Sequence, residues 1–249
     1  MGIMEKFTDQ TVLISGATRG IGKAIARRFL EAEAHIVGVY AGNNEAAQLF
    51  ADENRQFADR FELLQCNVAD EQQVAALFTR IDEKYPSLDV LVNNAGIRRD
   101  AMLAMMSYNQ WQDVLNTNLT GTYLMAKQAV LLMMKHKYGR IINITSPVAH
   151  LGFSGQANYA ASKAGQVALT KTLAKEVARK KITVNCVSPG FISTDFIAGL
   201  DLDLLAEYKK MVPMRRFGTP DEVAEAVLFL AGNRAAYISG TVLEVSGGL

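Results

Sequence analysis

The chain has 249 residues, of which 49% are hydrophobic, so it can bury a substantial core in one large domain or two small ones. Its 26 Lys and Arg residues nearly balance 25 Asp and Glu residues, and a formal charge of +1 gives no overall attraction for nucleic acid or an anionic membrane. The longest apolar runs are too short to cross a bilayer, and the first ten residues lack the apolar core of a signal peptide. We therefore expect a soluble, cytoplasmic protein that binds neither nucleic acid nor membrane.

Short β-branched runs alternate with longer segments of helical spacing along the whole chain. The runs are nearly continuously apolar, as in strands that are buried on both faces, and their alternation with helices indicates a parallel sheet with right-handed crossovers. The sequence therefore predicts a single α/β domain over 1–249, a doubly wound Rossmann-type fold with a seven-stranded parallel sheet. The expected strands are 11–15, 35–40, 61–66, 89–93, 140–145, 182–188 and 241–245.

The first strand is followed by "SGATRGIG", which leads into a helical segment. Glycines at such a position let the backbone turn tightly and approach a pyrophosphate, whose charge is favoured by the N-terminus of the next helix. The spacing differs from the G-x-G-x-x-G form, but the strand before it and the helix after it match what a dinucleotide site needs. We expect the cofactor to contact Gly16, Ala17, Thr18, Arg19, Gly20, Ile21 and Gly22.

The end of the second strand bears on the choice between NAD and NADP. NAD sites place an acidic side chain there for the adenosine ribose, whereas NADP sites lack it and supply a cation. This chain reads "VYAGNNE", with no acid before Glu45, and Arg19 stands in the glycine loop. NADP(H) is the expected cofactor. If Arg19 is only solvated and Glu45 only caps a helix, the preference stays open.

Three further features lie later in the chain. In "NYAASK", Tyr159 and Lys163 fall on one face of an expected helix, roughly 6 Å apart along its axis. Cys66 and Cys186 each lie in an apolar run without another cysteine or histidine at metal-ligand spacing, so we expect small core residues and no metal. The segment 191–217 lacks a clean period and is either a substrate flap or an ordinary surface helix and loop.

Several separated motifs together resemble the short-chain dehydrogenase/reductases. The resemblance runs nearly from end to end, and within that family it is strongest to the β-ketoacyl-acyl carrier protein reductases. The motifs that carry it are "SGATRGIG", "NVAD" at 67–70, "NNAGIRRD" at 93–100, "NTNLTG" around Asn118, "NITS" ending at Ser146, "GQANYAASKAG" at 155–165, "ITVNCVSPGFISTD" at 182–195, and "VSGG" at 245–248.

The resemblance implies four catalytic residues. Tyr159 would donate a proton to the substrate carbonyl, and Lys163 would stabilise the phenolate and hold the nicotinamide ribose. Ser146 would hydrogen-bond the substrate oxygen, and Asn118 would hold a water that reprotonates the lysine. Taken singly, each is more often an ordinary structural residue, and their coincidence in order behind the glycine loop favours the catalytic role. Beyond the glycine loop, the implied cofactor contacts are Asn67, Val68, Asn94, Ala95, Gly96, Tyr159, Lys163, Ile192 and Thr194.

The reaction that the resemblance implies is NADPH-dependent reduction of a 3-oxoacyl thioester on acyl carrier protein, as in fatty acid biosynthesis. The alternative is a reductase of the same family acting on another carbonyl, such as an acyl-coenzyme A, sugar or steroid. Pro147 and His150 depart from the closest pattern and put the substrate in doubt, not the reaction. His150 points either to the pocket mouth or to solvent.

Two kinds of partner are expected. The acidic carrier would dock on basic clusters at two helix ends, where the reductases carry cations matching Lys137 and Lys180; the helix dipole alone also favours cations there. The family further suggests a homotetramer, with helices at 107–137 and 155–180 in one interface. The Met-rich "AMLAMM" at 101–106 is either core or substrate-channel lining. The basic clusters are Lys135, Lys137 and Arg140, with Arg179, Lys180 and Lys181.

Overall fold

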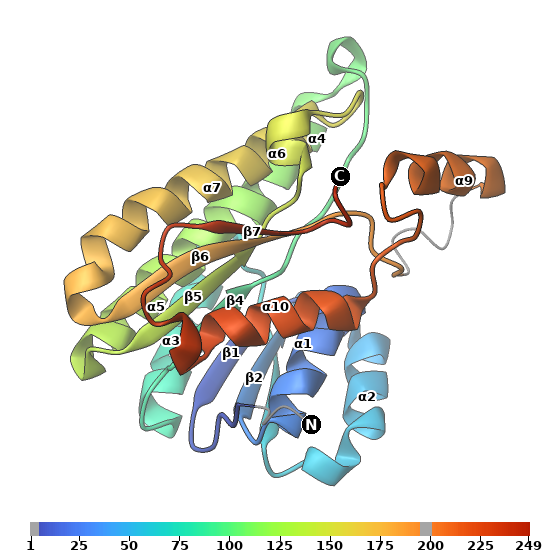
Figure 1. Ribbon diagram of the computed structural model, residues 1–249. Coiled ribbons are helices and arrows are strands. Elements are labelled where there is room, and N and C mark those ends of the chain that lie inside the picture. Colours follow the sequence, from blue (N-terminus) through green and yellow to red (C-terminus); the bar gives the residue numbers. More distant parts are fainter. Residues whose placement is uncertain (1–4, 195–200) are drawn as a thin grey trace.

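The computed structural model describes residues 5–194 and 201–249, which build one seven-stranded sheet (Figure 1). All strand pairs are parallel, and the order across the sheet is β3-β2-β1-β4-β5-β6-β7. The predicted doubly wound α/β domain is thereby confirmed. Each strand begins and ends within one residue of its predicted bounds: β1 (Thr11–Ser15), β2 (His35–Tyr40), β3 (Phe61–Gln65), β4 (Val90–Asn93), β5 (Gly139–Ile144), β6 (Ile182–Pro189) and β7 (Val242–Val245).

Helices cover both faces of the sheet. One layer consists of α1 (Gly20–Glu31), α2 (Asn44–Glu53) and α10 (Pro220–Ala231), in front of the sheet in Figure 1. The other layer consists of α3 (Glu71–Lys84), α5 (Gly121–His136) and α7 (Ala157–Val177). The other α-helices of the described residues lie outside these layers: α4 (Tyr108–Leu115) and α6 (Val148–Leu151) beside α7, and α9 (Leu202–Met211).

Successive residues of β1 face opposite helical layers. Val12 and Ile14 are buried in the cluster that includes α1 and α10, whereas Leu13 belongs to the cluster under α3 and α5. A strand covered on both sides must be apolar throughout, which explains the unbroken runs in the sequence. On the two helices, the buried residues recur at helical spacing: Val74, Leu77, Phe78 and Ile81 on α3, with Val223, Val227, Leu228 and Leu230 on α10.

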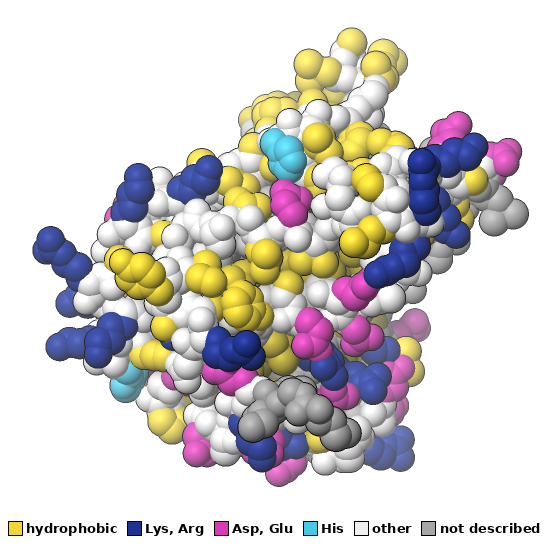
Figure 2. Space-filling view, in the orientation of Figure 1, with side chains coloured by type: hydrophobic (Ala, Val, Ile, Leu, Met, Phe, Trp, Pro, Cys, Tyr) yellow, Lys and Arg dark blue, Asp and Glu magenta, His cyan; other side chains and the backbone are white. Residues whose placement is uncertain are grey.

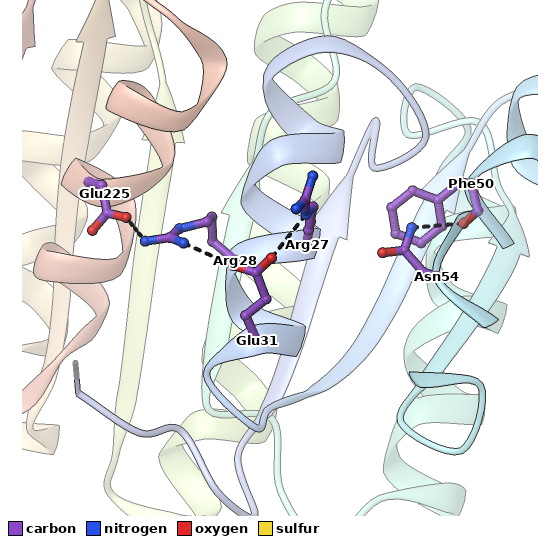
Figure 3. A network of polar contacts seen from close by, with 6 residues as sticks. All are labelled: Arg27, Arg28, Glu31, Phe50, Asn54 and Glu225. Atoms are coloured by element: carbon purple, nitrogen blue, oxygen red, sulfur yellow. Dashed lines mark hydrogen bonds and ion pairs between the residues drawn. The ribbon is translucent and has the colours of Figure 1, made fainter. Parts of the chain in front are cut away.

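Polar contacts align the front layer of helices. Figure 3 shows Arg28 of α1 between Glu31 on its own helix and Glu225 of α10. These side chains are 27% to 55% exposed, so the pairs add about 0 to 1 kcal/mol and mainly fix how the two helices lie. In the same view, the Asn54 amide donates to the Phe50 carbonyl at 2.8 Å and satisfies a carbonyl at the end of α2.

The strand order reverses direction between β1 and β4. Both neighbouring connections leave the carboxyl end of the sheet there, because β1 continues into α1 on one face and β4 leads toward α4 and α5 at the other. In open parallel sheets, a ligand crevice forms outside the carboxyl ends of the strands at this switch point. The fold therefore predicts the ligand site at the carboxyl ends of β1, β4 and β5.

The predicted flap segment, 191–217, leaves the sheet after β6. Ile192 forms an isolated parallel bridge with Gly218, so the segment begins and ends side by side. Phe191 stacks on Tyr208 of α9 with ring centroids 4.6 Å apart, and Phe153 and Phe217 flank it at 6.2 Å each. Residues 195–200 lie outside the described residues, so the flap itself stays a prediction.

The Met-rich segment at 101–106 projects from the body of the molecule. Met102, Leu103 and Met105 are 61%, 68% and 80% exposed. The segment forms the green tip at the top of Figure 1, and hydrophobic side chains cover this tip in Figure 2. The interpretation of these side chains as core is therefore wrong. Across the described residues, no helix is long and apolar enough to span a membrane.

Candidate active site

The glycine loop follows β1 directly and is fastened to β2. The backbone N–H groups of Gly16 and Ala17 both donate to the carbonyl of Val39, at 2.8 and 3.1 Å. Gly16 and Gly20 have φ of 68° and 53°, in the left-handed region that favours glycine. The chain can therefore turn sharply at the end of β1 and enter α1.

Gly22 allows the first turn of α1 to lie against the loop. A Cβ atom on Gly22 would lie 2.0 Å from the Gly16 carbonyl oxygen, so no other residue fits there. Arg19 is the N-cap of α1 and makes no side-chain capping bond, which leaves the first N–H groups of the helix available to an anion. The predicted loop, Gly16 to Gly22, thus fits a dinucleotide pyrophosphate.

Asn94 joins the end of β4 to this loop. Its amide nitrogen donates to the carbonyls of Ser15 and Gly16, at 3.1 and 3.0 Å. In return, the Ser15 hydroxyl accepts from the backbone N–H groups of Asn94 and Ala95, both at 3.1 Å. In "NNAG", Asn94 therefore holds the cofactor loop in shape. Direct contact of Asn94, Ala95 and Gly96 with the adenosine side stays a prediction.

The end of β2 carries no acidic side chain. After Tyr40 come Ala41 and Gly42, and Asn43 caps α2 by accepting from the Ala46 N–H at 2.9 Å. Glu45 lies in the first turn of α2. Arg19 is exposed and has no ion-pair partner among residues 5–194 and 201–249. An unpaired cation at the loop, without a competing carboxylate at Ala41, suits a phosphate on the adenosine ribose.

The residues after β3 play two different structural parts. Val68 is 6% exposed and packs on α5, where a Cβ on Gly121 would lie 2.8 Å from its Cγ2. Asn67 is exposed and borders an open cavity of about 580 Å³. Asn67 is accessible to an adenine and Val68 is held by the core. This cavity is lined by Asn67, Ala69, Asp70, Ile97, Arg99, Asp113, Asn116 and Thr117.

Ser146, Tyr159 and Lys163 meet beyond the carboxyl end of β5. Ser146 lies two residues after the strand, and Tyr159 and Lys163 lie one turn apart in α7, as predicted. Thr145 anchors the helix to the strand end. Its hydroxyl donates to the Lys163 carbonyl at 3.1 Å, and its backbone N–H donates to the Val187 carbonyl of β6 at 2.8 Å. The Lys163 Nζ lies 5.5 Å from the centre of the Tyr159 ring.

The Tyr159 phenol is held in its neutral form. Burial of the hydroxyl raises its pKa to about 12, and this rise is opposed first by Arg98 and then by a hydrogen bond with Ser146; Asp100 adds to it. Arg98 is the cation that opposes this rise, and the expected stabilisation of the phenolate by Lys163 stays a prediction. A protonated phenol beside the Ser146 hydroxyl is the form that can donate a proton to a carbonyl oxygen.

Lys163 is 3% exposed, and its ammonium is held by acceptors from two elements. Nζ donates to the Ile144 carbonyl at 2.7 Å and to Gln166 Oε1 at 3.1 Å. Burial lowers the pKa of Lys163 to about 8, and Cys186 acts in the opposite direction. The lysine is therefore an ammonium near neutral pH that loses its proton far more readily than an exposed lysine.

Asn118 lies in a π-helical turn, Asn116–Thr120, between α4 and α5. Its side-chain oxygen accepts from the Ile97 N–H at 2.8 Å, and its side-chain nitrogen donates to the Ile97 carbonyl and to Ser162, at 3.0 and 3.1 Å. This side chain ties the segment after β4 to α7. The backbone carbonyl of Asn118 accepts from Gln166 and Thr122, so the water expected there stays a prediction.

Thr194 and Ile192 differ in their position relative to the glycine loop. A Cβ on Gly20 would lie 3.6 Å from Thr194 Cγ2, so Thr194 lies over the loop on the expected cofactor side. Ile192 is 6% exposed and packs in the front core cluster. Their contacts with the nicotinamide stay predictions.

Two polar residues of this region were missed by reasoning from the sequence. Gln166 contacts Lys163 directly, and Arg98 acts on Tyr159 while pairing with Asp100 at 2.5 Å. The signal for Gln166 was its place three residues after Lys163, on the same helical face. Within the described residues, no cluster of His, Cys, Asp and Glu is placed to hold a metal, and Cys66 and Cys186 are buried and unpaired in disulfides.

Comparison with known proteins gives consistent matches over nearly the whole chain. A family model described as Enoyl-(Acyl carrier protein) reductase matches residues 16–249. A 3-oxoacyl-acyl-carrier-protein reductase of Aquifex aeolicus is 40% identical over 245 residues, 98% of each chain. The Vibrio harveyi protein of that name is 44% identical over 237 residues, 95% of this chain and 96% of the relative. A Synechocystis protein named likewise is 43% identical over 247 residues, 99% of each chain.

Proposed function

Because the chain belongs to the short-chain dehydrogenase/reductase family, we propose that it reduces a 3-oxoacyl thioester on acyl carrier protein to the 3-hydroxyacyl thioester, with NADPH, in fatty acid biosynthesis. The observation that carries the proposal is the meeting of the Ser146 and Tyr159 hydroxyls beyond β5, at the same edge of the sheet as the glycine loop. The names of relatives at 40% to 44% identity support the substrate.

The chemistry divides between the cofactor and this chain. Bound NADPH would supply the hydride that adds to the C3 carbonyl carbon. Tyr159 donates its proton to the carbonyl oxygen, so that C=O becomes CH–OH, and Ser146 donates a hydrogen bond that stabilises the negative charge developing on that oxygen. Lys163 places a buried ammonium beside Tyr159, where it would also bind the nicotinamide ribose. The resting phenol, with its pKa of about 12, is fully protonated for this step.

The residues expected near the adenosine end of the cofactor support NADPH rather than NADH. Arg19 is exposed without an ion-pair partner in the described part of the chain, and Ala41 and Gly42 leave the end of β2 uncharged. A 2′-phosphate would gain an ion pair with Arg19, and no carboxylate at Ala41 would repel it.

Docking of the carrier is proposed on Lys137 and Lys180. Not all residues of the expected basic clusters are available for it. Lys137 is exposed as the left-handed C-cap of α5, and Lys180 ends the short turn after α7. Lys135 instead pairs with Asp82 at 2.7 Å. Arg140 is 3% exposed, lies on the Tyr138 ring at 4.4 Å, and is not available on the surface, because it belongs to β5. The prediction that Arg140 belongs to an exposed basic cluster is therefore wrong, whereas Lys135 and Lys137 are exposed.

A homotetramer is supported by exposed apolar side chains on the helices expected in one interface. Tyr108 on α4 and Tyr123 and Leu131 on α5 are 73%, 45% and 56% exposed. Burial of such side chains between copies would remove apolar surface from water. The mass in solution, measured by light scattering coupled to gel filtration, tests this part: a monomer would contradict it.

The first experiment measures NADPH oxidation with acetoacetyl-acyl carrier protein and with acetoacetyl-coenzyme A, with NADH as the control cofactor. We expect NADPH-dependent turnover that is fastest on the carrier-linked substrate. Turnover on neither thioester, with NADPH still bound, would overturn the proposed substrate and leave the reductase chemistry in place. Equal rates with NADH would overturn the cofactor assignment alone.

A further inference from the structure

Gln166 provides a hydrogen-bond acceptor inside the protein for the lysine of the active site. It lies in α7 three residues after Lys163 and is 0% exposed. Its Oε1 accepts from Lys163 Nζ at 3.1 Å, and the only other acceptor of this ammonium among the described residues is the Ile144 carbonyl, at 2.7 Å. An ammonium removed from water is stable only when its N–H groups find acceptors, so Gln166 is one of two groups that meet this need.

The other end of the same amide is equally committed. Gln166 Nε2 donates to the Asn118 carbonyl and to the Thr122 hydroxyl, each at 2.7 Å. Thr122 donates in turn to the Asn118 carbonyl at 2.7 Å. Lys163 can only donate and the Asn118 carbonyl can only accept, so the amide cannot be reversed without breaking contacts at both ends. Gln166 is therefore fixed in one orientation.

We propose that Gln166 is a positioning residue of the reduction: its amide links the Asn118 carbonyl to the Lys163 ammonium and holds that ammonium in its charged, oriented form. This inference rests on the proposed function, in which Lys163 supports Tyr159 and the cofactor ribose. Asn118 thereby reaches Lys163 through a side chain of the protein. The π-helical turn that contains Asn118 gives this connection a rigid starting point.

Few charges act on Lys163 from its surroundings. The titratable groups that face it are Tyr159 on the same helix and Cys186 from β6, while Arg98 and Asp100 act on Tyr159 from the segment after β4. Burial already lowers the pKa of Lys163 to about 8. Removal of the Gln166 oxygen would favour the neutral amine further, whereas a carboxylate at this position would favour the ammonium.

The test compares Gln166→Met, Gln166→Glu and a matched control, Thr170→Val. Thr170 is also 0% exposed on α7, but it bonds Asn143 and Cys186 and does not touch Lys163. The dissociation constant of NADPH, followed by its fluorescence, and kcat/KM on acetoacetyl-acyl carrier protein are measured from pH 6 to pH 10. In the wild type, NADPH affinity and kcat/KM should both fall as the pH rises. We expect the midpoint of this fall to lie about one pH unit lower in Gln166→Met and higher in Gln166→Glu, with no shift in Thr170→Val.

The outcomes separate positioning from mere structural support. If Gln166→Met lowers the melting temperature as Thr170→Val does but keeps the wild-type pH profile, the proposal is wrong. If Gln166→Met does not fold, the Gln166→Glu profile decides, and an alkaline limb at the wild-type pH overturns the proposal. If the wild type reduces neither thioester, the proposed function fails, and the pH dependence of NADPH binding still tests Gln166 independently.

Discussion

The Lys163 ammonium lies 5.5 Å from the centre of the Tyr159 ring, and burial drives the two groups toward their neutral forms. The pKa of the phenol rises to about 12, and that of the lysine falls to about 8. The resting site therefore holds a firmly protonated acid beside a base that is protonated only up to mildly alkaline pH. This relationship makes the stability of the protein depend on pH in a specific window.

The buried ammonium of Lys163 is expected to destabilise the folded protein below about pH 8. This effect should disappear above pH 10.5. Its pKa is about 8 when folded against 10.5 for an ordinary lysine, so between these values the unfolded chain binds more protons. The free energy of unfolding therefore rises with pH across this window, by about 3 kcal/mol at most. Urea unfolding without cofactor at pH 7.5 to 10 measures the rise, which should be missing in Lys163→Met. A rise of equal size in the variant would exclude Lys163 as its source.

Tyr159→Phe removes the proton donor and little else. We expect kcat/KM to fall by about two to four orders of magnitude, the usual contribution of a general acid. The ring remains to pack, so NADPH affinity should change by less than about threefold. Stopped-flow turnover and a fluorescence titration measure the two quantities. Turnover near the wild-type rate would rule out Tyr159 as the acid.

Gly22→Ala should abolish the close approach of α1 to the glycine loop. The added Cβ would lie 2.0 Å from the Gly16 carbonyl oxygen, so the loop must shift where the pyrophosphate is expected. NADPH affinity should fall about a hundredfold, or near 3 kcal/mol. Gly42→Ala is the matched control for stability, because its Cβ meets nothing within 4 Å, and its melting temperature should equal that of the wild type. Wild-type NADPH affinity in Gly22→Ala would contradict the proposal that the glycine loop binds the pyrophosphate.

Ala41→Asp should shift the cofactor preference toward NADH. A carboxylate at the end of β2 can accept from the ribose hydroxyls of NADH and repels the 2′-phosphate of NADPH. We expect the ratio of kcat/KM values for NADPH and NADH to fall at least about tenfold. Arg19→Ala is the companion variant, which should weaken NADPH and leave NADH unchanged. An unaltered ratio in Ala41→Asp, Gly42→Asp and Arg19→Ala would contradict this account of selectivity.

Tyr208→Ala tests the predicted flap. The Tyr208 ring stacks on Phe191 at 4.6 Å with 13° between the planes, and this contact connects α9 to the end of β6. Loss of the stack should raise KM for the acyl thioester by several-fold, with a smaller change in NADPH affinity. Tyr237→Ala, on a wholly exposed ring, is the control. An unchanged KM in Tyr208→Ala would favour an ordinary surface helix over a flap.

The fold was predictable because its determinants are local. Runs such as Thr11–Ser15 are apolar without interruption, and only strands buried on both faces require that pattern. The spacing of Val74, Leu77, Phe78 and Ile81 likewise gave the buried side of α3. For the same reason the glycine loop was recognisable, since Gly16 and Gly22 are needed by backbone geometry within one short segment.

The parts that were missed depend on contacts between distant segments. Arg140 resembles a surface cation in the sequence, but its place in β5 beside β6 buries it under Tyr138. Asn94 is typical of a turn, and only the pairing of β1 with β4 brings it to the glycine loop. The connection from Gln166 to Asn118 spans 48 residues of chain and cannot be read from either motif alone.

The π-helical turn at Asn116–Thr120 also governs which changes of chain length the protein tolerates. Such a turn holds about one residue more than the α-helical turn it replaces. A one-residue deletion there would rotate α5 by about 100° relative to α4 and would take Met125, Ala129 and Met133 out of the core. Substitutions can alter the chemistry of this turn, but a deletion would disturb the core and the Asn118 carbonyl together. The number of residues in the turn is therefore fixed.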